Sequence, residues 1–540
     1  MQLTGSQVII ECLKEQGVDT VFGYPGGAIL NVYDELYKHP EIKHVLTSHE
    51  QGASHAADGY ARSTGKVGVC LATSGPGATN LVTGISTAYM DSIPIVAITC
   101  NVGVSLLGKD SFQEIDIAGI TTPVTKYSFI VKDVEKLADT IRRAFDIARK
   151  GRPGPVLIDI PMDVQKAVID FEYPEKCEIR SYKPTTKGNY VQVRRVMAAL
   201  EEAEKPLICI GGGVFAAHAE NEIRELADLM QIPVITTMMG ISVFPDDDQL
   251  FCGMIGTHGV KMANAAVNEC DVLFLVGARV GDRAVKTPLA LEKTTKIIHI
   301  DIDPAEIGKN IGADLPLVGD AKLVLQQMTE LAKPMKHDEW IAHIKTLGGE
   351  RKYVEPATGT VNPRVFIDRL AKKMPANVTV VADVGQNQIW TCTEYKFRKE
   401  GRLLTSGGMG TMGYSVPAAI GAKMADNSRA TVAICGDGAF QMSFMELATA
   451  VQFGVDIKVV VMTNNRLGMV RELQTNGYHD RQTAVFLDGS PDFIKLAEAY
   501  GIPAMRVYDD DTMDKGIEML AEHKGICLVE VVVDKDMPTL

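Results

Sequence analysis

The sequence predicts an α/β protein made of three consecutive, doubly wound domains with parallel sheets. Short runs rich in valine and isoleucine alternate with helix-length segments along the chain. Each run is apolar without interruption, as expected of strands covered on both faces. The chain has 540 residues, which is too long for one hydrophobic core. Many runs end in Gly, Ser, Asp or Asn, at the strand ends where such folds bind ligands.

This pattern occurs three times and predicts three domains. The first, residues 1–165, contains the runs VGVCLATSGPG, IPIVAITCN and GPVLIDIP. The second, residues 191–332, contains PLICIGGGV, DVLFLVGARV and TKIIHIDIDP. The third, residues 363–534, contains VTVVADVGQNQ, ATVAICGDG, IKVVVMTNN and ICLVEVVV. The polar stretches 171–190 and 333–362 between them are predicted linkers.

Composition argues against several classes of function. The net charge is −13 and no block of Lys and Arg stands out, which disfavours binding to nucleic acid or an anionic membrane. The ten cysteines are scattered without a Cys-x-x-Cys pair, so we expect buried, reduced thiols. The N-terminus shows no basic, Ser-rich or long apolar leader, and no apolar run is long enough to cross a bilayer. We therefore expect a cytoplasmic protein.

One stretch of the third block, GDGAFQMSFMELATAVQFGVDIKVVVMTNN, suggests a ligand site. Asp437 follows the run ATVAIC and Asn464 follows IKVVVMT, so both side chains should emerge at the same edge of a parallel sheet. A carboxylate and an amide oxygen are suitable ligands for Mg²⁺. Gly436 and Gly438 allow the backbone to approach a diphosphate, toward which a helix starting near Phe440 would direct its N-terminus. The alternative is an ordinary turn and loop of the fold.

Gly-Asp-Gly followed by Asn-Asn one strand later resembles the signature of thiamine diphosphate (ThDP) enzymes. The resemblance extends over almost the whole chain to the catalytic subunit of acetohydroxyacid (acetolactate) synthase. The segments EQGASHAADGYARSTG (50–65), GKDSFQEIDIAGITTP (108–123) and SGGMGTMGYSVPAAIGAK (406–423) carry it. It implies ThDP, Mg²⁺ and a structural FAD as cofactors, which makes the protein a flavoprotein. It also implies a homodimer or dimer of dimers with the active site between subunits, and a possible small regulatory subunit.

The resemblance implies roles for individual residues of the ThDP site. Asp437, Asn464 and the main-chain carbonyl of Arg466 would bind the metal. Glu50 would hydrogen-bond the aminopyrimidine ring, because a buried carboxyl there favours the tautomer that removes the thiazolium proton. Met412 would bend the cofactor. The other residues implied to contact ThDP are Tyr24, Pro25, Gly26, Gly385, Gln386, Asn387, Gly410, Gly436, Gly438, Ala439, Met442 and Met469.

The substrate and FAD sites follow from the same resemblance. Lys109, Phe112 and Gln113 would line the reaction centre, and Arg283 would bind the carboxylate of the acceptor in a charge-assisted pair. Glycine-rich strand ends admit a dinucleotide, so the middle domain would bind FAD. The residues implied for FAD are Arg152, Gly211, Gly212, Gly213, His258, Gly277, Arg279, Asp301 and Asp320.

Several positions depart from the family pattern, including Met162, Thr257 and Asn387. Leu473 stands where a tryptophan is usual, and losing an indole removes a large apolar surface, so we expect a wider and less selective acceptor pocket. The chain also ends soon after its final strand, without the longer tail that helps cover the cofactor in the family. We therefore expect the cofactor site to be less well closed.

The predicted function is that of an acetolactate synthase in branched-chain amino acid biosynthesis. Pyruvate would be decarboxylated and joined to a second 2-oxoacid, giving 2-acetolactate or 2-aceto-2-hydroxybutyrate. One alternative is another ThDP-dependent carboligase or decarboxylase with a different donor or acceptor. A non-catalytic, nucleotide-binding scaffold is a second alternative, but it would not explain the joint presence of Glu50, Asp437 and Asn464.

Overall fold

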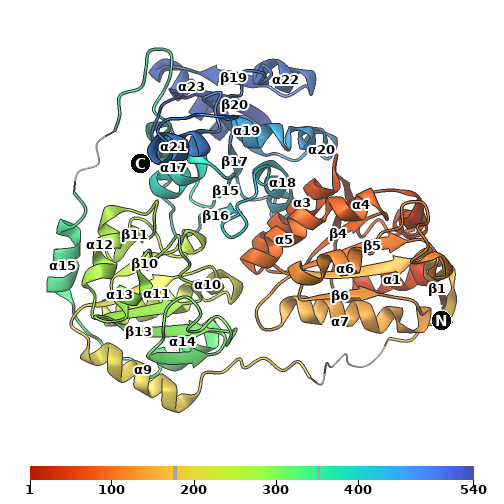
Figure 1. Ribbon diagram of the computed structural model, residues 1–540, viewed down its shortest axis with the longest axis horizontal. Helices are drawn as coiled ribbons and strands as arrows, with labels where there is room; N and C mark the ends of the chain where they lie inside the picture. Colours follow the sequence, from red (N-terminus) through yellow and green to blue (C-terminus); the bar gives the residue numbers. More distant parts are fainter. Residues whose placement is uncertain (174–178, 180, 350–352) are drawn as a thin grey trace.

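A computed structural model describes residues 1–173, 179, 181–349 and 353–540. It contains three six-stranded sheets in which every strand pairing is parallel, which confirms the predicted α/β class (Figure 1). The apolar runs singled out in the sequence form central strands of these sheets. The predicted linkers lie partly outside the described residues.

The N-terminal sheet has the strand order β3-β2-β4-β5-β7-β6. Its strands are β2 (Thr20–Tyr24), β3 (Lys43–Leu46), β4 (Gly68–Ala72), β5 (Ile95–Asn101), β6 (Tyr127–Ile130) and β7 (Val156–Pro161). Its helices are α1 (Gly5–Glu15), α2 (Leu30–Lys38), α3 (Glu50–Thr64), α4 (Pro76–Asn80), α5 (Val82–Asp91), α6 (Ile117–Thr121), α7 (Leu137–Arg149) and α8 (Met162–Lys166). A small antiparallel pair, β1 (Gln2–Thr4) with β8 (Val168–Asp170), ties the start of the chain to the segment just past residue 165.

The central sheet has the order β11-β10-β9-β12-β13-β14. Its strands are β9 (Pro206–Ile210), β10 (Val234–Thr236), β11 (Phe251–Met254), β12 (Val272–Val276), β13 (Lys296–Asp301) and β14 (Leu315–Val318). Its helices are α9 (Tyr190–Glu202), α10 (Gly213–Ala216), α11 (Glu220–Met230), α12 (Lys261–Glu269), α13 (Pro288–Leu291), α14 (Ala321–Thr329) and α15 (Asp338–Thr346). Helix α15 lies within the predicted linker 333–362, yet its Trp340 is buried and donates to the carbonyl of Pro206. This part of the predicted linker therefore packs on the central domain.

The C-terminal sheet has the order β16-β15-β17-β18-β20-β19. Its strands are β15 (Thr379–Ala382), β16 (Arg402–Thr405), β17 (Thr431–Gly436), β18 (Lys458–Thr463), β19 (Ala504–Val507) and β20 (Cys527–Val532). Its helices are α16 (Pro363–Lys373), α17 (Gln386–Glu394), α18 (Ser415–Ala425), α19 (Asp437–Gln441), α20 (Leu447–Gln452), α21 (Gly468–Gly477), α22 (Phe493–Ala499) and α23 (Asp510–Glu522).

The prediction of a helix that starts near Phe440 needs a correction. Helix α19 already begins at Asp437 and is only five residues long. A 3₁₀ turn (Phe444–Glu446) follows before α20. The break lets Glu446 accept hydrogen bonds from the backbone N–H groups of Ser48 and His49 in the N-terminal domain. A tertiary contact thus interrupts what the sequence suggests is one helix.

Helices α3 and α18 join the N-terminal and C-terminal domains, and they lie side by side in Figure 1. Their approach requires glycine at two positions. A Cβ atom on Gly59 would lie 2.0 Å from the carbonyl oxygen of Ala418, and one on Gly421 would lie 1.9 Å from that of Ala56. Arg62 forms ion pairs with Asp58 and Asp91 beside this contact.

Among the described residues, no helix is both long enough and apolar enough to cross a membrane.

Candidate cofactor and active site

Asp437 and Asn464 meet at the carboxyl edge of the C-terminal sheet, as the sequence predicts. The Asp437 carboxylate accepts the N–H groups of Asn464 (3.1 Å) and Asn465 (2.7 Å) with one oxygen, and that of Gly438 (2.8 Å) with the other. Parallel pairing of β17 with β18 brings the two strand ends together. This edge therefore presents a carboxylate beside an amide side chain.

The Asp437 side chain has little access to water, since the residue is 2% exposed. Burial raises the pKa of Asp437 to about 6, and its hydrogen bonds to backbone N–H groups act in the opposite direction. In the described part of the chain no group of three or more His, Cys, Asp or Glu residues could hold a metal. A carboxylate, an amide oxygen and a main-chain carbonyl form an oxygen-only donor set, which fits Mg²⁺ and does not suit zinc.

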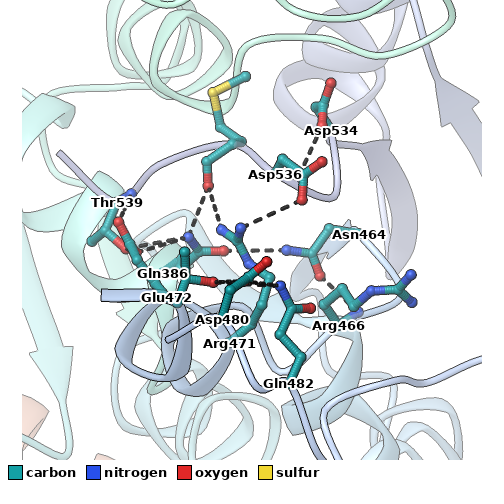
Figure 2. Close-up of polar contacts among 12 residues, drawn as sticks. Gln386, Asn464, Arg466, Arg471, Glu472, Asp480, Gln482, Asp534, Asp536 and Thr539 are labelled. Carbon is teal, nitrogen blue, oxygen red and sulfur yellow. Dashed lines mark hydrogen bonds and ion pairs between the residues drawn. The ribbon is translucent and has the colours of Figure 1, made fainter. Parts of the chain in front are cut away.

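Gln386, the first residue of α17, is tied to Asn464 (Figure 2). Asn464 accepts the N–H of Arg466 with its side-chain oxygen (3.0 Å) and donates with its amide nitrogen to Gln386 (3.2 Å). Gly468 makes room for this pair, because a Cβ atom there would lie 1.9 Å from Oε1 of Gln386. Asn464 and Gln386, which come from segments distant in sequence, therefore form one hydrogen-bonded group.

The last residues of the chain lie over this group (Figure 2). Gln386 donates to the carbonyl of Met537 (2.9 Å) and to the hydroxyl of Thr539 (3.2 Å). Trp390 donates to the carbonyl of Pro538 (3.2 Å). Met537 and Thr539 are both buried. The final residues therefore fold back onto α17 and α21 beside Gln386, and the closure of the cofactor site stays a prediction.

The remaining ThDP segments of the third domain gather at the same edge. A Cβ atom on Gly438 would lie 3.5 Å from Cε of Met412, and one on Gly413 would lie 3.0 Å from Cβ of Met442. Gly385 and Gly410 have φ angles of 136° and 69°, which only glycine adopts readily. Ala439 is buried in α19, and Met469 lies in the first turn of α21. Segments distant in sequence thus form one cradle.

Glu50 is the first residue of α3 and is 8% exposed. One carboxylate oxygen accepts from the amide of Asn80 (2.9 Å), and the other lies against Gly77. Within the described chain, no hydrogen bond or ion pair joins Glu50 to Asp437 or Asn464. Tyr24 is the last residue of β2 in the same domain, and Pro25 and Gly26 follow it. A Cβ atom on Gly26 would lie 2.4 Å from the Thr73 side chain.

The loop with Lys109, Phe112 and Gln113 lies on the surface of the single chain. Phe112 is 86% exposed and Lys109 is exposed. Gln113 has a φ angle of 59°, and its Cα would be 3.0 Å from a Cβ atom on Gly75.

A cavity of about 1500 Å³ lies where the three domains meet. Its lining includes Arg283 and Leu473, and Leu473 is 61% exposed. Arg152 lines it too, and forms ion pairs with Glu306 (2.7 Å) and Asp303 (3.5 Å). The other residues predicted for FAD that line it are Gly212, Gly213, His258, Gly277, Arg279, Asp301 and Asp320.

Gly211 is the one residue of the predicted FAD set that is not part of this lining. It packs behind the cavity, since a Cβ atom on Gly211 would lie 2.1 Å from the carbonyl oxygen of Gly277. Gly277 has a φ angle of 55°. Burial raises the pKa of Asp301 at the cavity wall to about 6. The volume of about 1500 Å³, the glycines of its lining and a guanidinium at its wall fit a dinucleotide.

Some residues of the site do not stand out in the sequence. Asn80 is the partner of Glu50, and Asp383 accepts hydrogen bonds from two loops. Asp383 directly follows the strand run VTVVA, and this position at a strand end could have identified it as a candidate site residue. Thr539 and Trp390 carry no comparable signal, because their contacts depend on how the tail folds back.

Family models match the chain in three successive segments. Residues 3–120 match the N-terminal TPP binding domain of thiamine pyrophosphate enzymes, residues 193–328 their central domain, and residues 383–531 their C-terminal TPP binding domain. The strand-end cradle described above lies in the third segment. The class is therefore that of enzymes dependent on thiamine diphosphate.

Relatives narrow this class. The chain is 45% identical over 555 residues to an acetolactate synthase of Arthrospira platensis, covering 99% of this chain and 95% of the relative. It is 45% identical over 547 residues to the acetolactate synthase large subunit of Corynebacterium glutamicum, covering 99% and 87%. It is 40% identical over 546 residues to the isozyme 3 large subunit of Escherichia coli, covering 98% and 95%. The chain belongs to the acetolactate synthase family.

Proposed function

We propose that this chain catalyses the acetolactate synthase reaction, in which pyruvate loses CO₂ and is joined to a second 2-oxoacid. The observation that carries the proposal is the 40–45% identity to named acetolactate synthases over nearly the full length. The product from two pyruvates is 2-acetolactate, and the proposed role is in branched-chain amino acid biosynthesis. With 2-oxobutyrate as acceptor the product is 2-aceto-2-hydroxybutyrate.

The metal is proposed to be Mg²⁺. Asp437, the side-chain oxygen of Asn464 and the main-chain carbonyl of Arg466 would hold it, leaving positions for diphosphate oxygens and water. Two observations support this assignment: Asp437 and Asn464 are neighbours, and Asp437 is buried. The domains predicted at 1–165 and 363–534 would bind the pyrimidine and diphosphate ends of ThDP.

When bound, ThDP supplies a nucleophilic carbon and an electron sink for decarboxylation. Glu50 would hold a proton at the ring nitrogen of the aminopyrimidine, a role suited to its buried position. Gln113 would orient the bound substrate carbons, with Phe112 and Lys109 in the same loop. Arg283 would hold the acceptor carboxylate. Its side chain is 80% exposed at the cavity wall and would exchange its ion pair with Asp282 (3.7 Å) for that carboxylate.

FAD is proposed as a structural cofactor in the cavity between the three domains. The fit rests on the volume of the cavity and on the glycines and acidic residues that line it. Arg152 would exchange its contacts with Glu306 and Asp303 for a phosphate or ring edge. The condensation of two 2-oxoacids involves no net redox change, so no electron transfer is assigned to the flavin. The domain predicted at 191–332 would carry most of this site.

The proposed assembly is a homodimer, or a dimer of dimers, with Glu50 and Asp437 of different chains at one active site. The exposed Phe112 would then be covered by the partner. Two of the relatives are named large subunits, so a small regulatory subunit is a proposed partner. We propose a cytoplasmic location.

One experiment tests the function. Purified protein is incubated with ThDP, Mg²⁺, FAD and pyruvate, and both acetolactate and acetaldehyde are measured. Acetolactate as the main product is expected. Acetaldehyde alone would favour a decarboxylase, the main alternative. Bound ThDP without either product would indicate a different pair of substrates.

A further inference from the structure

Asp383 joins the two segments of the third domain that are predicted to hold opposite ends of ThDP. It follows β15 and is fully buried. One carboxylate oxygen accepts the N–H groups of Val384 (2.8 Å) and Gly413 (3.0 Å). The other accepts the N–H (2.8 Å) and the hydroxyl (2.7 Å) of Ser415. One side chain thus receives four hydrogen bonds from two loops.

The two loops are those assigned to the cofactor. Val384 directly precedes Gly385, Gln386 and Asn387, the diphosphate segment. Gly413 directly follows Gly410–Met412, the segment assigned to the rings. Glycines with positive φ occur in both segments, 136° at Gly385 and 87° at Gly413, and each segment leads directly into a helix, α17 from Gln386 and α18 from Ser415. The carboxylate of Asp383 is what connects them.

The main chain of Asp383 extends the same connection. Its N–H donates to the carbonyl of Ile434 (2.8 Å), and its own carbonyl accepts from the side-chain amide of Asn387 (2.8 Å). That amide also donates to Ile434 (3.2 Å), so the oxygen of Asn387 faces Gly385 and Gly436. The backbone at position 383 therefore also orients a side chain assigned to the diphosphate.

An ionised carboxylate suits this arrangement. Burial raises the pKa of Asp383, and the hydrogen bonds from Ser415, Val384 and Gly413 act in the opposite direction. Three of the four donors are backbone N–H groups, which cannot accept a hydrogen bond from a protonated carboxyl. Placing a carboxylate out of water is costly unless it is fully bonded, as it is here. A solely structural link between loops could be made by apolar packing at less cost.

We propose that Asp383 is a positioning residue that sets the distance between the diphosphate segment and the ring segment of the ThDP site. The proposal rests on the proposed function, because it assumes that ThDP binds across these two loops. Asp383 does not touch the cofactor; it acts through Met412 and Asn387. Its loss should therefore alter the geometry of bound ThDP more than the occupancy.

The test compares Asp383→Asn with a matched control, Asp246→Asn. Asp246 is another mostly buried carboxylate that accepts a backbone N–H, that of Phe397 (2.8 Å), but it contacts neither cofactor loop. An asparagine at 383 would turn an N–H₂ group toward backbone donors and leave at least one of them unpaired. For both variants and the wild-type holoenzyme we would measure thermal unfolding, ThDP affinity with Mg²⁺, and kcat for acetolactate. The exchange of the C2 proton of bound ThDP with deuterium is the fourth measurement.

At saturating ThDP, Asp383→Asn should lower both kcat and the rate of C2 proton exchange by roughly ten- to a hundred-fold. Losses of this size are typical when a group that orients a ligating residue is removed. The Asp246→Asn control should lose stability while keeping both rates. Wild-type rates in Asp383→Asn at saturation would overturn the proposal. So would rates that fall equally in the control, because that result would show a general effect of removing a buried carboxylate.

Ser415→Ala serves if Asp383→Asn does not fold. It removes one of the four donors and leaves the carboxylate bonded to three N–H groups, so exchange should slow by roughly three- to ten-fold. Unchanged exchange would overturn the proposal. Wild-type protein that fails to bind ThDP would overturn this inference together with the proposed function. Wild-type protein that exchanges the C2 proton but forms no acetolactate would overturn only the function, and the exchange rates would then decide on Asp383.

Discussion

Deletion of the last four residues, Met537–Leu540, should weaken cofactor binding while scarcely changing the stability of the fold. Met537 is buried, and the tail makes hydrogen bonds to Gln386 and Trp390. Thr539 also bonds Glu472 through both its N–H and its hydroxyl. The tail is thus held by one apolar anchor and a small set of polar contacts.

The free energies for and against ordering these residues nearly cancel. Burying the Met537 side chain contributes about 1.5–3 kcal/mol. Three hydrogen bonds between neutral groups contribute about 1 kcal/mol each, and the bonds to Glu472 about 1.5–3 kcal/mol. Ordering four residues costs about 4–8 kcal/mol. The midpoints of these ranges leave a net stabilisation of about 1.5 kcal/mol and their upper end is about 5 kcal/mol, so the deletion should lower the free energy of unfolding by no more than a few kcal/mol.

The effect on the cofactor should be larger. Gln386 loses both of its tail acceptors, and it is the residue that bonds Asn464. Loss of a group that orients a metal ligand typically costs about ten-fold or more in affinity. Calorimetric titration with ThDP and Mg²⁺, alongside thermal unfolding of the cofactor-free protein, separates the two effects. The control is deletion of Leu540 alone, which is 54% exposed. Wild-type ThDP affinity in the four-residue deletion would refute the reasoning, as would a loss of stability several times the predicted value.

Three further predictions concern the proton chemistry, the acceptor pocket and the response to pH. Glu50→Gln should lower turnover by at least about a hundred-fold, as expected when a proton-transferring group is lost, and should keep most of the ThDP affinity. Near-normal turnover would show that the role assigned to Glu50 is wrong. Leu473→Trp should raise the preference for 2-oxobutyrate over pyruvate as acceptor, because the side chain lines the cavity and an indole adds apolar contact. An unchanged product ratio in a competition assay would count against this role of position 473. Burial, and to a lesser extent Arg62, lowers the pKa of His55 from 6.5 to about 3. Between these two pKa values the unfolded state binds a proton at His55 that the folded state does not bind. The stability contributed by neutral His55 is therefore complete above pH 6.5 and is lost as the pH falls toward 3. His55→Phe should flatten the dependence of the unfolding midpoint on pH in this window, and the same slope in both proteins would disprove the assignment.

Much of the fold could be predicted from local pattern. The uninterrupted apolar runs correspond to β4, β5, β7, β9, β12, β13, β15, β17, β18 and β20. The positions of Asp437 and Asn464 follow from the same logic, since parallel strands end at one edge. The five-residue α19 could not be foreseen, because the helix is broken by a contact between Glu446 and the backbone at Ser48 and His49.

The sequence by itself determined the three-domain α/β class and the family of cofactor. The class depends on periodicity within short windows, and the cofactor family on the resemblance of a strand-end motif to that of ThDP enzymes. Only the tertiary structure decided which side chains support the cofactor residues. The bonds from Asp383 to Ser415 span 32 positions and the bond from Gln386 to Met537 spans 151. Contacts over such separations depend on how whole strands and the tail are placed, and no local pattern of residues encodes them.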